Sequence, residues 1–473
     1  MSTDLLTLDR KLALAARALD GWRAEIAVDG RRDDDDPLVG FAELTSRSLI
    51  DSIEKSGFDL VSTVPPLLLS TGLHEATKEA PFADPLAELR GPLASWCTHL
   101  HLARLIREAT AVRAAAMRDE READTYGRVA SLRAMLRSLC RPKQAGGVPE
   151  AKAAVAITDL APQLLDGIID EEIRRRELGD PIGPLARCCV QTDPKVVAAA
   201  QAYLHDTEDE AREQWGHGAK SAGRPLKNAS WVDAFAVRRA ADVSEGWPAT
   251  LSGRWLAELA RGTELLAGLK VDVKVDAGRS TPRASYSGLY LVPPTGAWTF
   301  AHALHALGGA LHLFGRDDKR PFAPHSPPHD QRRYVMGEAF MALVSTEAFH
   351  ARARGVSKAK AQHAARRLAL TRLLERRQLA LRVVLAPELA RGRRAFVEAF
   401  GGLAEDALLG EAPRELASLL GAPGPLGPAE DAARFLAIGP GEALFQSLTE
   451  RFDSDWWRNP KAAAAIRDRC AVG

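Results

Sequence analysis

Three histidines stand at helical spacing in the segment WTFAHALHALGGALH, residues 298–312. At about 100° per residue, Trp298, His302, His305 and His312 fall on one face of a helix, less than a third of its circumference wide. Each buried imidazole needs partners for two nitrogen atoms, so an apolar helix face does not collect histidines freely. The segment is therefore the first place to look for a metal site or for acid–base chemistry.

The tail of this segment fits the zinc-binding pattern H-E-x-x-H, but its beginning does not. His302 takes the place of the second histidine. Trp298 stands where the first histidine would be, and its indole N–H is a donor with no lone pair for a metal. Thr299 stands where a glutamate would take a proton from zinc-bound water, which a hydroxyl cannot do at neutral pH. The pattern predicts that no catalytic residue is left here.

A carboxylate that could join these histidines lies in a second predicted helix. Glu338 sits in the apolar frame VMGEAF, where a carboxylate is either a metal ligand or the partner of a buried base. His302 and His305 share a helix face, so with Glu338 they form a conceivable rearranged zinc site. Two other interpretations stay open: the histidines are hydrogen-bonded structurally, or His325 and His329 of the intervening loop are recruited.

Helix dominates the elements that must position these residues. Residues 268–294 are the exception, because Val271, Val273 and Val275 alternate with charged residues and predict a half-exposed strand. The following SYSGLYLV predicts a second strand and carries Tyr286. We therefore expect a small sheet directly ahead of the histidine helix. Elsewhere apolar residues recur at three- and four-residue spacing, in the ranges 5–28, 39–56, 85–140, 149–177, 193–213 and 231–268 and from 296 to the end.

Composition is that of an ordinary globular chain and favours no charged partner. The 473 residues are 46% hydrophobic and 26% charged, which is typical of soluble domains. Basic and acidic side chains number 63 and 62 and leave a formal net charge of +1. That balance gives no electrostatic reason to expect nucleic acid or a membrane surface as a partner. No stretch approaches the roughly 18 apolar residues of a membrane span.

The cysteines and the first residues predict a cytoplasmic protein. Charged residues from Asp4 to Lys11 interrupt the apolar run that an export signal needs. The five cysteines are scattered, without a C-x-x-C pair, which argues against a disulfide framework or a cysteine-based metal site. They are Cys97, Cys140, Cys188, Cys189 and Cys470.

Several pieces of the chain, in a shared order and spacing, resemble the thimet-oligopeptidase-like family of zinc peptidases and its bacterial carboxypeptidase-like relatives. Pro282–Ala284 with the strand Ser285–Val292 resembles the family's R-P-R-A-F segment. Residues 300–305, FAHALH, match the tail of H-E-F-G-H-A-L-H, and Gly337–Phe340 resembles the third-ligand motif. Two late segments also resemble the family's late helices, LERRQLALRVVLAPELA (374–390) and FDSDWWRNPKAAAAIRD (452–468).

The resemblance implies a mainly α, two-lobed, zincin-like architecture of the glutamate type, with the small sheet beside the site helix. It implies an N-terminal helical lobe at residues 1–267 and a peptidase-like lobe at 268–473, with a cleft between them. Carried over by position, His302 is the second zinc ligand and Glu338 the third. The chain would then be a degenerate member that lacks the first histidine and the glutamate of H-E-x-x-H.

Three functions stay open from the sequence. A pseudopeptidase would bind a peptide or protein segment in the cleft without cutting it and would need no cofactor. A zinc-dependent oligopeptidase or carboxypeptidase-like hydrolase would use rearranged ligands, and a structural or assembly protein would use the fold alone. The lost ligand and base favour the pseudopeptidase. The residues expected in its cleft are Trp298, Thr299, His302, His305, Glu338 and Tyr286.

Overall fold

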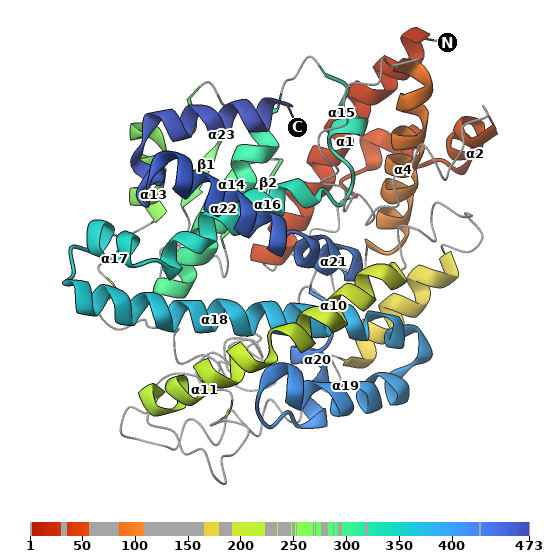
Figure 1. Ribbon diagram of the computed structural model, residues 1–473. Coiled ribbons are helices and arrows are strands. Elements are labelled where there is room, and N and C mark those ends of the chain that lie inside the picture. Colours follow the sequence, from red (N-terminus) through yellow and green to blue (C-terminus); the bar gives the residue numbers. More distant parts are fainter. Residues whose placement is uncertain are drawn as a thin grey trace.

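The computed structural model describes most of the C-terminal half of the chain and separate parts of the N-terminal half. Within them the chain is mainly helical with one small sheet, so the predicted fold class is confirmed (Figure 1). Within the same residues no helix is long and apolar enough to cross a membrane. The described residues are 2–29, 36–55, 85–107, 165–178, 192–222, 234, 247, 251, 253–267, 269, 271–275, 282–286, 288–291, 296–316, 320–424 and 427–472.

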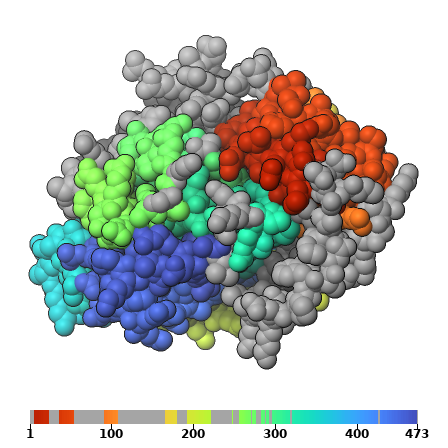
Figure 2. Space-filling model, turned by 90° about the horizontal axis from the view of Figure 1, so that it is seen from above, coloured from red at the N-terminus to blue at the C-terminus, as the bar shows by residue number. Residues whose placement is uncertain are grey.

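The N-terminal helices pack against a segment that lies two hundred residues further along the chain. Helix α1 (Ser2–Asp29) packs on α4 (Pro85–Leu105), beside the 3-10 helix η1 (Val39–Thr45) and α2 (Arg47–Lys55). Their buried core also takes Phe322 of the short helix α15 (Phe322–His325). The carboxylate of Asp9 accepts hydrogen bonds from the backbone N–H groups of Phe322 and Ala323, at 2.6 and 2.7 Å. Figure 2 shows these N-terminal helices, in red, beside the green-to-cyan part of the chain.

The middle of the chain shares its core with the histidine helix. Helix α10 (Pro194–Asp206) begins at Asp193, whose side chain accepts a hydrogen bond from the N–H of Lys195, with Pro194 in the first turn. Val196 and Ala200 of α10 lie in the same buried cluster as the helices that carry His302 and Glu338. Helices α11 (Glu208–Ala222) and α13 (Gly253–Gly262) and a helix at residues 165–178 complete this part. A lobe boundary at residue 267 stays a prediction.

The sheet has three short strands in the order β1-β3-β2. Strand β1 (Val273–Val275) runs parallel to β3 (Gly288–Leu291), and β2 (Arg283–Ser285) runs antiparallel to it. The single strand predicted at 285–292 is therefore divided into two. Gly288 explains the reversal, because its φ of +152° is one that L side chains rarely adopt, and a Cβ there would lie 2.6 Å from the carbonyl oxygen of Asp272. Val275 is 45% exposed at the edge strand β1, whereas the alternating pattern predicts that it lies on the covered face with Val271 and Val273.

The histidine helix α14 (Ala297–Gly315) runs through the interior of the protein. It packs on β2 and β3 on one side and on α16 (Gln331–Met341) on another. From Ala297 to Leu313 every residue is buried except Thr299, His302 and His305. A helix that is apolar almost all round must be covered almost all round. The three exceptions are three residues apart, so they form one narrow stripe along the helix.

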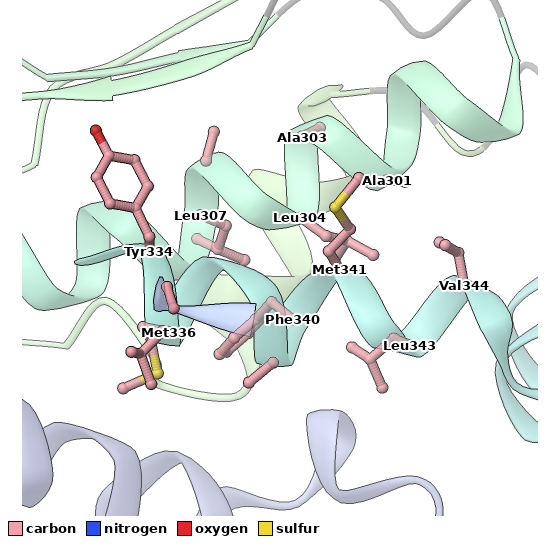
Figure 3. Packing of buried hydrophobic residues seen from close by; sticks show 14 of the residues in the cluster. Ala301, Ala303, Leu304, Leu307, Tyr334, Met336, Phe340, Met341, Leu343 and Val344 are labelled. Carbon is pink, nitrogen blue, oxygen red and sulfur yellow. The ribbon is translucent and has the colours of Figure 1, made fainter. Parts of the chain in front are cut away.

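Close backbone contact between α14 and α16 fixes how their side chains meet. Gly308 of α14 has no Cβ, and one added there would overlap the carbonyl oxygen of Met336 in α16. Figure 3 shows apolar side chains of the two helices, among them Leu304, Leu307 and Phe340, filling the space along this contact. A glycine in a helical segment such as Gly308 indicates either a close-packed neighbour or the end of the helix. In the structure Gly308 has a close-packed neighbour and is not at the helix end, because α14 continues to Gly315.

The C-terminal half is a layered set of helices around the long helix α18 (Lys358–Leu385). Arg377 of α18 is fully buried and donates to Leu204 O and Thr207 Oγ1 at the end of α10. It also donates to Asp406 O and Ala407 O near the end of α19 (Arg393–Leu408), so one guanidinium joins the ends of two helices to α18. The other elements are η2 (Ala342–Ser345), α17 (Glu347–Arg354), η3 (Ala386–Arg391), α19 (Arg393–Leu408), η4 (Arg414–Leu416), α20 (Ala417–Leu420), α21 (Pro428–Leu436), α22 (Ile438–Phe452), η5 (Trp456–Arg458) and α23 (Pro460–Val472).

Replacing Gly308 by alanine should destabilise the protein by about 1–3 kcal/mol, because the new methyl group forces α14 away from the α16 backbone. Gly402→Ala is the matched control, since nothing lies within 4 Å of the added Cβ in helix α19. That change should raise the free energy of unfolding by about 0.5–1 kcal/mol. Urea unfolding monitored by circular dichroism measures both. Equal effects of the two substitutions would contradict the close contact.

Candidate functional site

The three partly exposed residues of α14 face the long helix α18 and helix α16. We call Thr299, His302 and His305 of α14, Glu338 of α16 and Glu375 of α18 the polar stripe. The side chains of His302 and Glu375 are 24% and 28% exposed, whereas those of His305 and Glu338 are 17% and 11% exposed. The stripe therefore has a solvent-accessible end at His302 and a nearly buried end at Glu338.

At the accessible end, Glu375 holds together two residues that the sequence had singled out. The indole Nε1 of Trp298 donates a hydrogen bond to Glu375 Oε1 at 2.6 Å. The other oxygen, Oε2, lies 3.6 Å from Nε2 of His302. The rings of Trp298 and His302 meet edge to face, with centroids 5.2 Å apart. Trp298 itself is 3% exposed, so it positions Glu375 from the interior and contributes little to the exposed surface of the stripe.

At the buried end, Glu338 is paired with two arginines of α18. Its Oε2 lies 2.8 Å from Nη2 of Arg376 and 3.4 Å from Nη2 of Arg372. Arg376 also bonds to Glu442 of α22, whose side chain is 46% exposed. Burial alone would raise the pKa of Glu338, but Arg376 and Arg372 outweigh it and lower the pKa to about 2. Glu338 is therefore ionised, and its charge is compensated by guanidinium groups.

His305 lies between the two helices and faces Glu338. Its Nε2 is 4.0 Å from Glu338 Oε1, and a Cβ added at Gly337 would come within 2.8 Å of the imidazole. Burial lowers the pKa of His305 to about 3, against the opposing effect of Glu338. The imidazole is therefore neutral at pH 7 and interacts with the carboxylate as a dipole.

Most of the predicted site residues lie in the polar stripe, and Tyr286 lies apart from it. Helices α14 and α16 do pack together, and they bring His305 rather than His302 to Glu338; His302 meets Glu375 instead. Tyr286 lies apart from the stripe, where it packs on Phe322 and under the guanidinium of Arg316, just beyond the C-terminal end of α14.

The remaining histidines of the region have structural partners or lie elsewhere. His312 donates from Nε2 to Asp330 Oδ2 at 2.7 Å, and the other oxygen of Asp330 caps the first turn of α16. His329 lies beside Glu430, and His325 ends the short helix α15. None of the three joins the stripe.

The residues of the stripe do not fit a zinc ion as they are arranged. A ligand carboxylate must offer its oxygen to the metal, but Glu338 Oε2 already has two guanidinium groups within 3.4 Å. Two positive groups at that distance also oppose a divalent cation electrostatically. Among the residues that the structure describes, no three His, Cys, Asp or Glu side chains cluster closely enough to hold a metal ion.

Sequence reasoning missed the three α18 residues Arg372, Glu375 and Arg376. The sequence did contain a sign of these partners, because RLLERRQLALRVVL places charged residues among leucines and valines. A solvated helix face would repeat its charges every three or four residues, whereas Glu375, Arg376 and Arg377 are consecutive. Charges that point in several directions from one helix imply partners on several sides. Which partners these are cannot be read from the sequence.

Comparisons with known proteins give a distant likeness to a solved structure. No protein-family model matches the chain, and no curated protein sequence matches it. Among solved structures, one described as a Pyrococcus furiosus carboxypeptidase, apo-Mg, is similar to this chain with a TM-score of 0.48 and 10% sequence identity. The match covers 99% of this chain and 91% of that one. The site is therefore interpreted from its own geometry.

Removing the charge of Glu338 should leave two buried guanidinium groups without their main partner. Glu338→Gln is expected to lower the free energy of unfolding by about 3–5 kcal/mol, the cost of breaking one side of a buried ion pair. Glu442→Gln removes a half-exposed partner of the same Arg376 and should cost less than about 1 kcal/mol. Chemical denaturation of both variants at pH 7 tests this. Similar losses in the free energy of unfolding for the two variants would mean that Glu338 is not the main partner of the two arginines.

The stability of the protein should fall as the pH drops below 6.5, in two separable stages. His305 has its pKa lowered from 6.5 to about 3, so the unfolded chain binds its proton first and stability falls from pH 6.5 downward. Glu338 has its pKa lowered from 4.5 to about 2, so its contribution is complete above pH 4.5 and is lost only below it. His305→Gln should therefore make the stability profile less steep between pH 6.5 and 4.5, where His99, His329 and His350, whose pKa values are also lowered, supply the remaining slope, and should leave the decline below pH 4.5.

The control for this profile is His363→Gln, because His363 is an exposed histidine of α18. The comparison isolates the effect of replacing a buried histidine from that of replacing an exposed one. Free energies of unfolding measured in urea at half-unit pH steps give the slopes. A His305→Gln profile that is as steep as that of the control between pH 6.5 and 4.5 would show that His305 is not held neutral.

Proposed function

We propose that this chain is a non-catalytic protein with a metallopeptidase-like fold, which binds a peptide or protein segment at the polar stripe without cleaving it. The observation that carries the proposal is the state of Glu338, the carboxylate that the resemblance makes the third zinc ligand. Arg376 and Arg372 take the space and the charge-compensating role that a cation would have there.

The loss of catalytic groups does not depend on how the pattern is aligned. Ending H-E-x-x-H at His302 puts Trp298 and Thr299 at the first histidine and the glutamate. Ending it at His305, the residue that faces Glu338, puts Ala301 and His302 there. In both frames the first ligand is missing and no carboxylate is left to act as the base, a group worth roughly 10²–10⁴-fold in rate.

The accessible end of the stripe supports a binding role. His302 and Glu375 are both about one-quarter exposed, offer a donor and an acceptor, and are held in place by the buried Trp298. Polar groups positioned by buried neighbours are suited to hydrogen-bond an extended backbone. The scattered cysteines agree with a cytoplasmic setting for such a protein.

The proposal predicts that the purified protein carries well under one zinc ion per chain and does not cleave quenched-fluorescent peptides. A chelator should leave its melting temperature unchanged, because no bound metal contributes to folding. Elemental analysis, fluorescence assays and thermal melts measure these three properties. Stoichiometric zinc together with chelator-sensitive cleavage that is lost in His302→Ala would overturn the proposal and favour a hydrolase with rearranged ligands.

Binding itself is tested on an array of short peptides, followed by titration of any hit. His302→Ala should weaken such a complex by about 1–3 kcal/mol, since a positioned hydrogen-bond partner is lost. His363→Ala, on the exposed side of α18, is the matched control and should bind as the unsubstituted chain does. An array without any hit, or hits that are insensitive to His302, would argue for a structural protein that uses the fold alone.

A further inference from the structure

Two buried histidines lie where the N-terminal helices meet the rest of the described chain. We call the surface between α1 and α4 on one side and β2, α15 and residues 329–333 on the other the docking interface. His99 belongs to α4 and His329 to the segment just before α16, and they are 6% and 7% exposed. Their rings meet edge to face, with centroids 5.0 Å apart. Because the two residues are far apart in the sequence, this contact exists only while α4 is docked.

Carboxylates of α1 hold backbone groups on the other side of the docking interface. Asp9 accepts hydrogen bonds from the N–H groups of Phe322 and Ala323 at 2.6 and 2.7 Å. Asp20 Oδ2 accepts one from the N–H of Tyr286 at 2.7 Å. Asp9 and Asp20 lie about three helical turns apart and therefore on the same face of α1. These three backbone N–H groups lose their partners when α1 leaves.

The N-terminal helices have a buried core of their own. Leu12 of α1, Leu44 of η1 and Leu93 of α4 belong to one buried cluster. Within the described residues, the buried members of this cluster that come from outside these helices are Phe322 and Ala323. Separation at the docking interface would therefore expose little apolar surface and leave the N-terminal helices folded against one another.

A hydrogen bond holds His99 in its neutral form. Nη1 of Arg23 in α1 lies 3.1 Å from Nε2 of His99. Because arginine can only donate, this nitrogen of His99 accepts and carries no proton. A proton on Nε2 would set two positively charged donors against each other in a buried site. The docked arrangement is therefore compatible only with the neutral imidazole.

Charged groups from several elements surround the two imidazoles. Glu430 Oε2 lies 3.7 Å from His329 Nδ1, and Glu430 Oε1 accepts from Arg333 Nη2 at 2.8 Å. Arg23, His329 and Arg175 all disfavour a proton on His99. The charged groups of this region are Asp20 and Arg23 of α1, Arg283 of β2, Arg333 of α16, Glu430 of α21, and the paired Glu171, Glu172, Arg175 and Arg176 of the helix at 165–178.

The protonation behaviour of both histidines follows from this setting. Burial, with Arg23, His329 and Arg175, holds the pKa of His99 well below its usual 6.5. Burial also lowers the pKa of His329, against the opposing effect of Glu430. A histidine whose pKa is lowered in the docked form takes up a proton on release. Docking is thus strongest above pH 6.5 and weakens below it, by about tenfold per pH unit for each histidine.

We propose that the docking interface is an acid-sensitive switch, in which protonation of His99 and His329 releases α1 and α4 from β2, α15 and the start of α16. The switch lies apart from the polar stripe and does not depend on the proposed function. Release would uncover Phe322 and Ala323, which are 4% and 1% exposed in the docked form. Asp9 opposes release in acid, because burial raises its pKa above the usual 3.8 in the docked form.

Backbone amide exchange measures release directly, because the N–H groups of Tyr286, Phe322 and Ala323 are bonded to α1 carboxylates. Dividing the intrinsic exchange rate at each pH by the measured rate gives a protection factor. The protection factors of these three amides should fall by more than tenfold between pH 6 and pH 5, toward a limit of about a hundredfold set by two histidines. Helical amides of α18, outside the docking interface, should stay better protected at both pH values.

His99→Gln tests the switch at its centre, because glutamine keeps an acceptor for Arg23 but takes up no proton. In this variant the fall in protection between pH 6 and pH 5 should be about tenfold smaller. His350→Gln is the matched control, since His350 is a buried histidine of α17 with a lowered pKa, outside the docking interface. It should keep the fall of the unsubstituted protein at the three amides.

Three outcomes would overturn the proposal. Protection factors of the three amides that stay constant from pH 6 to pH 5 would rule out the switch. Protection factors equal to those of α18 at pH 5 would mean that only global unfolding frees α1. An equal pH dependence in His99→Gln and His350→Gln would show that His99 does not take up the proton. If His99→Gln does not fold, His329→Gln replaces it, with the same expected reduction of about tenfold.

Discussion

The close approach of α14 and α16 at Gly308 is the constraint on which the rest of the site depends. Without a side chain at Gly308, the α16 backbone at Met336 and Gly337 reaches α14, and His305 fits over Gly337. That approach turns Glu338 toward α18, where Arg372 and Arg376 receive it. A buried carboxylate tolerates this position only because it is paired. The geometry of the polar stripe thus follows from one missing methyl group.

The same physical rule explains both polar regions of the interior. Charges inside a protein need partners, and this fold supplies them from distant segments of the chain. At the polar stripe each carboxylate has partners, since Glu338 meets two arginines and Glu375 meets an indole N–H and an imidazole. In the second region, Arg283 lies beside Asp20 and Arg333 pairs with Glu430.

Under the proposed function, the absent catalytic groups and the architecture have separate causes. Trp298 and Thr299 stand at the positions of the first histidine and the glutamate in one frame, and Ala301 and His302 stand there in the other. The surrounding helix stays buried and apolar, because packing on β2, β3 and α16 depends on side-chain volume and does not depend on the metal. Trp298, at a candidate ligand position, is a buried residue whose indole N–H donates a hydrogen bond to Glu375.

The sequence by itself determined the helical class and the small sheet ahead of the histidine helix. These depend on local periodicity, which is written in consecutive residues. It did not determine that His305 rather than His302 meets Glu338, that Glu375, Arg372 and Arg376 complete the site, or that Tyr286 lies elsewhere. Those relations join residues tens of positions apart. They depend on the rotation of each helix about its axis, and only tertiary packing sets that rotation.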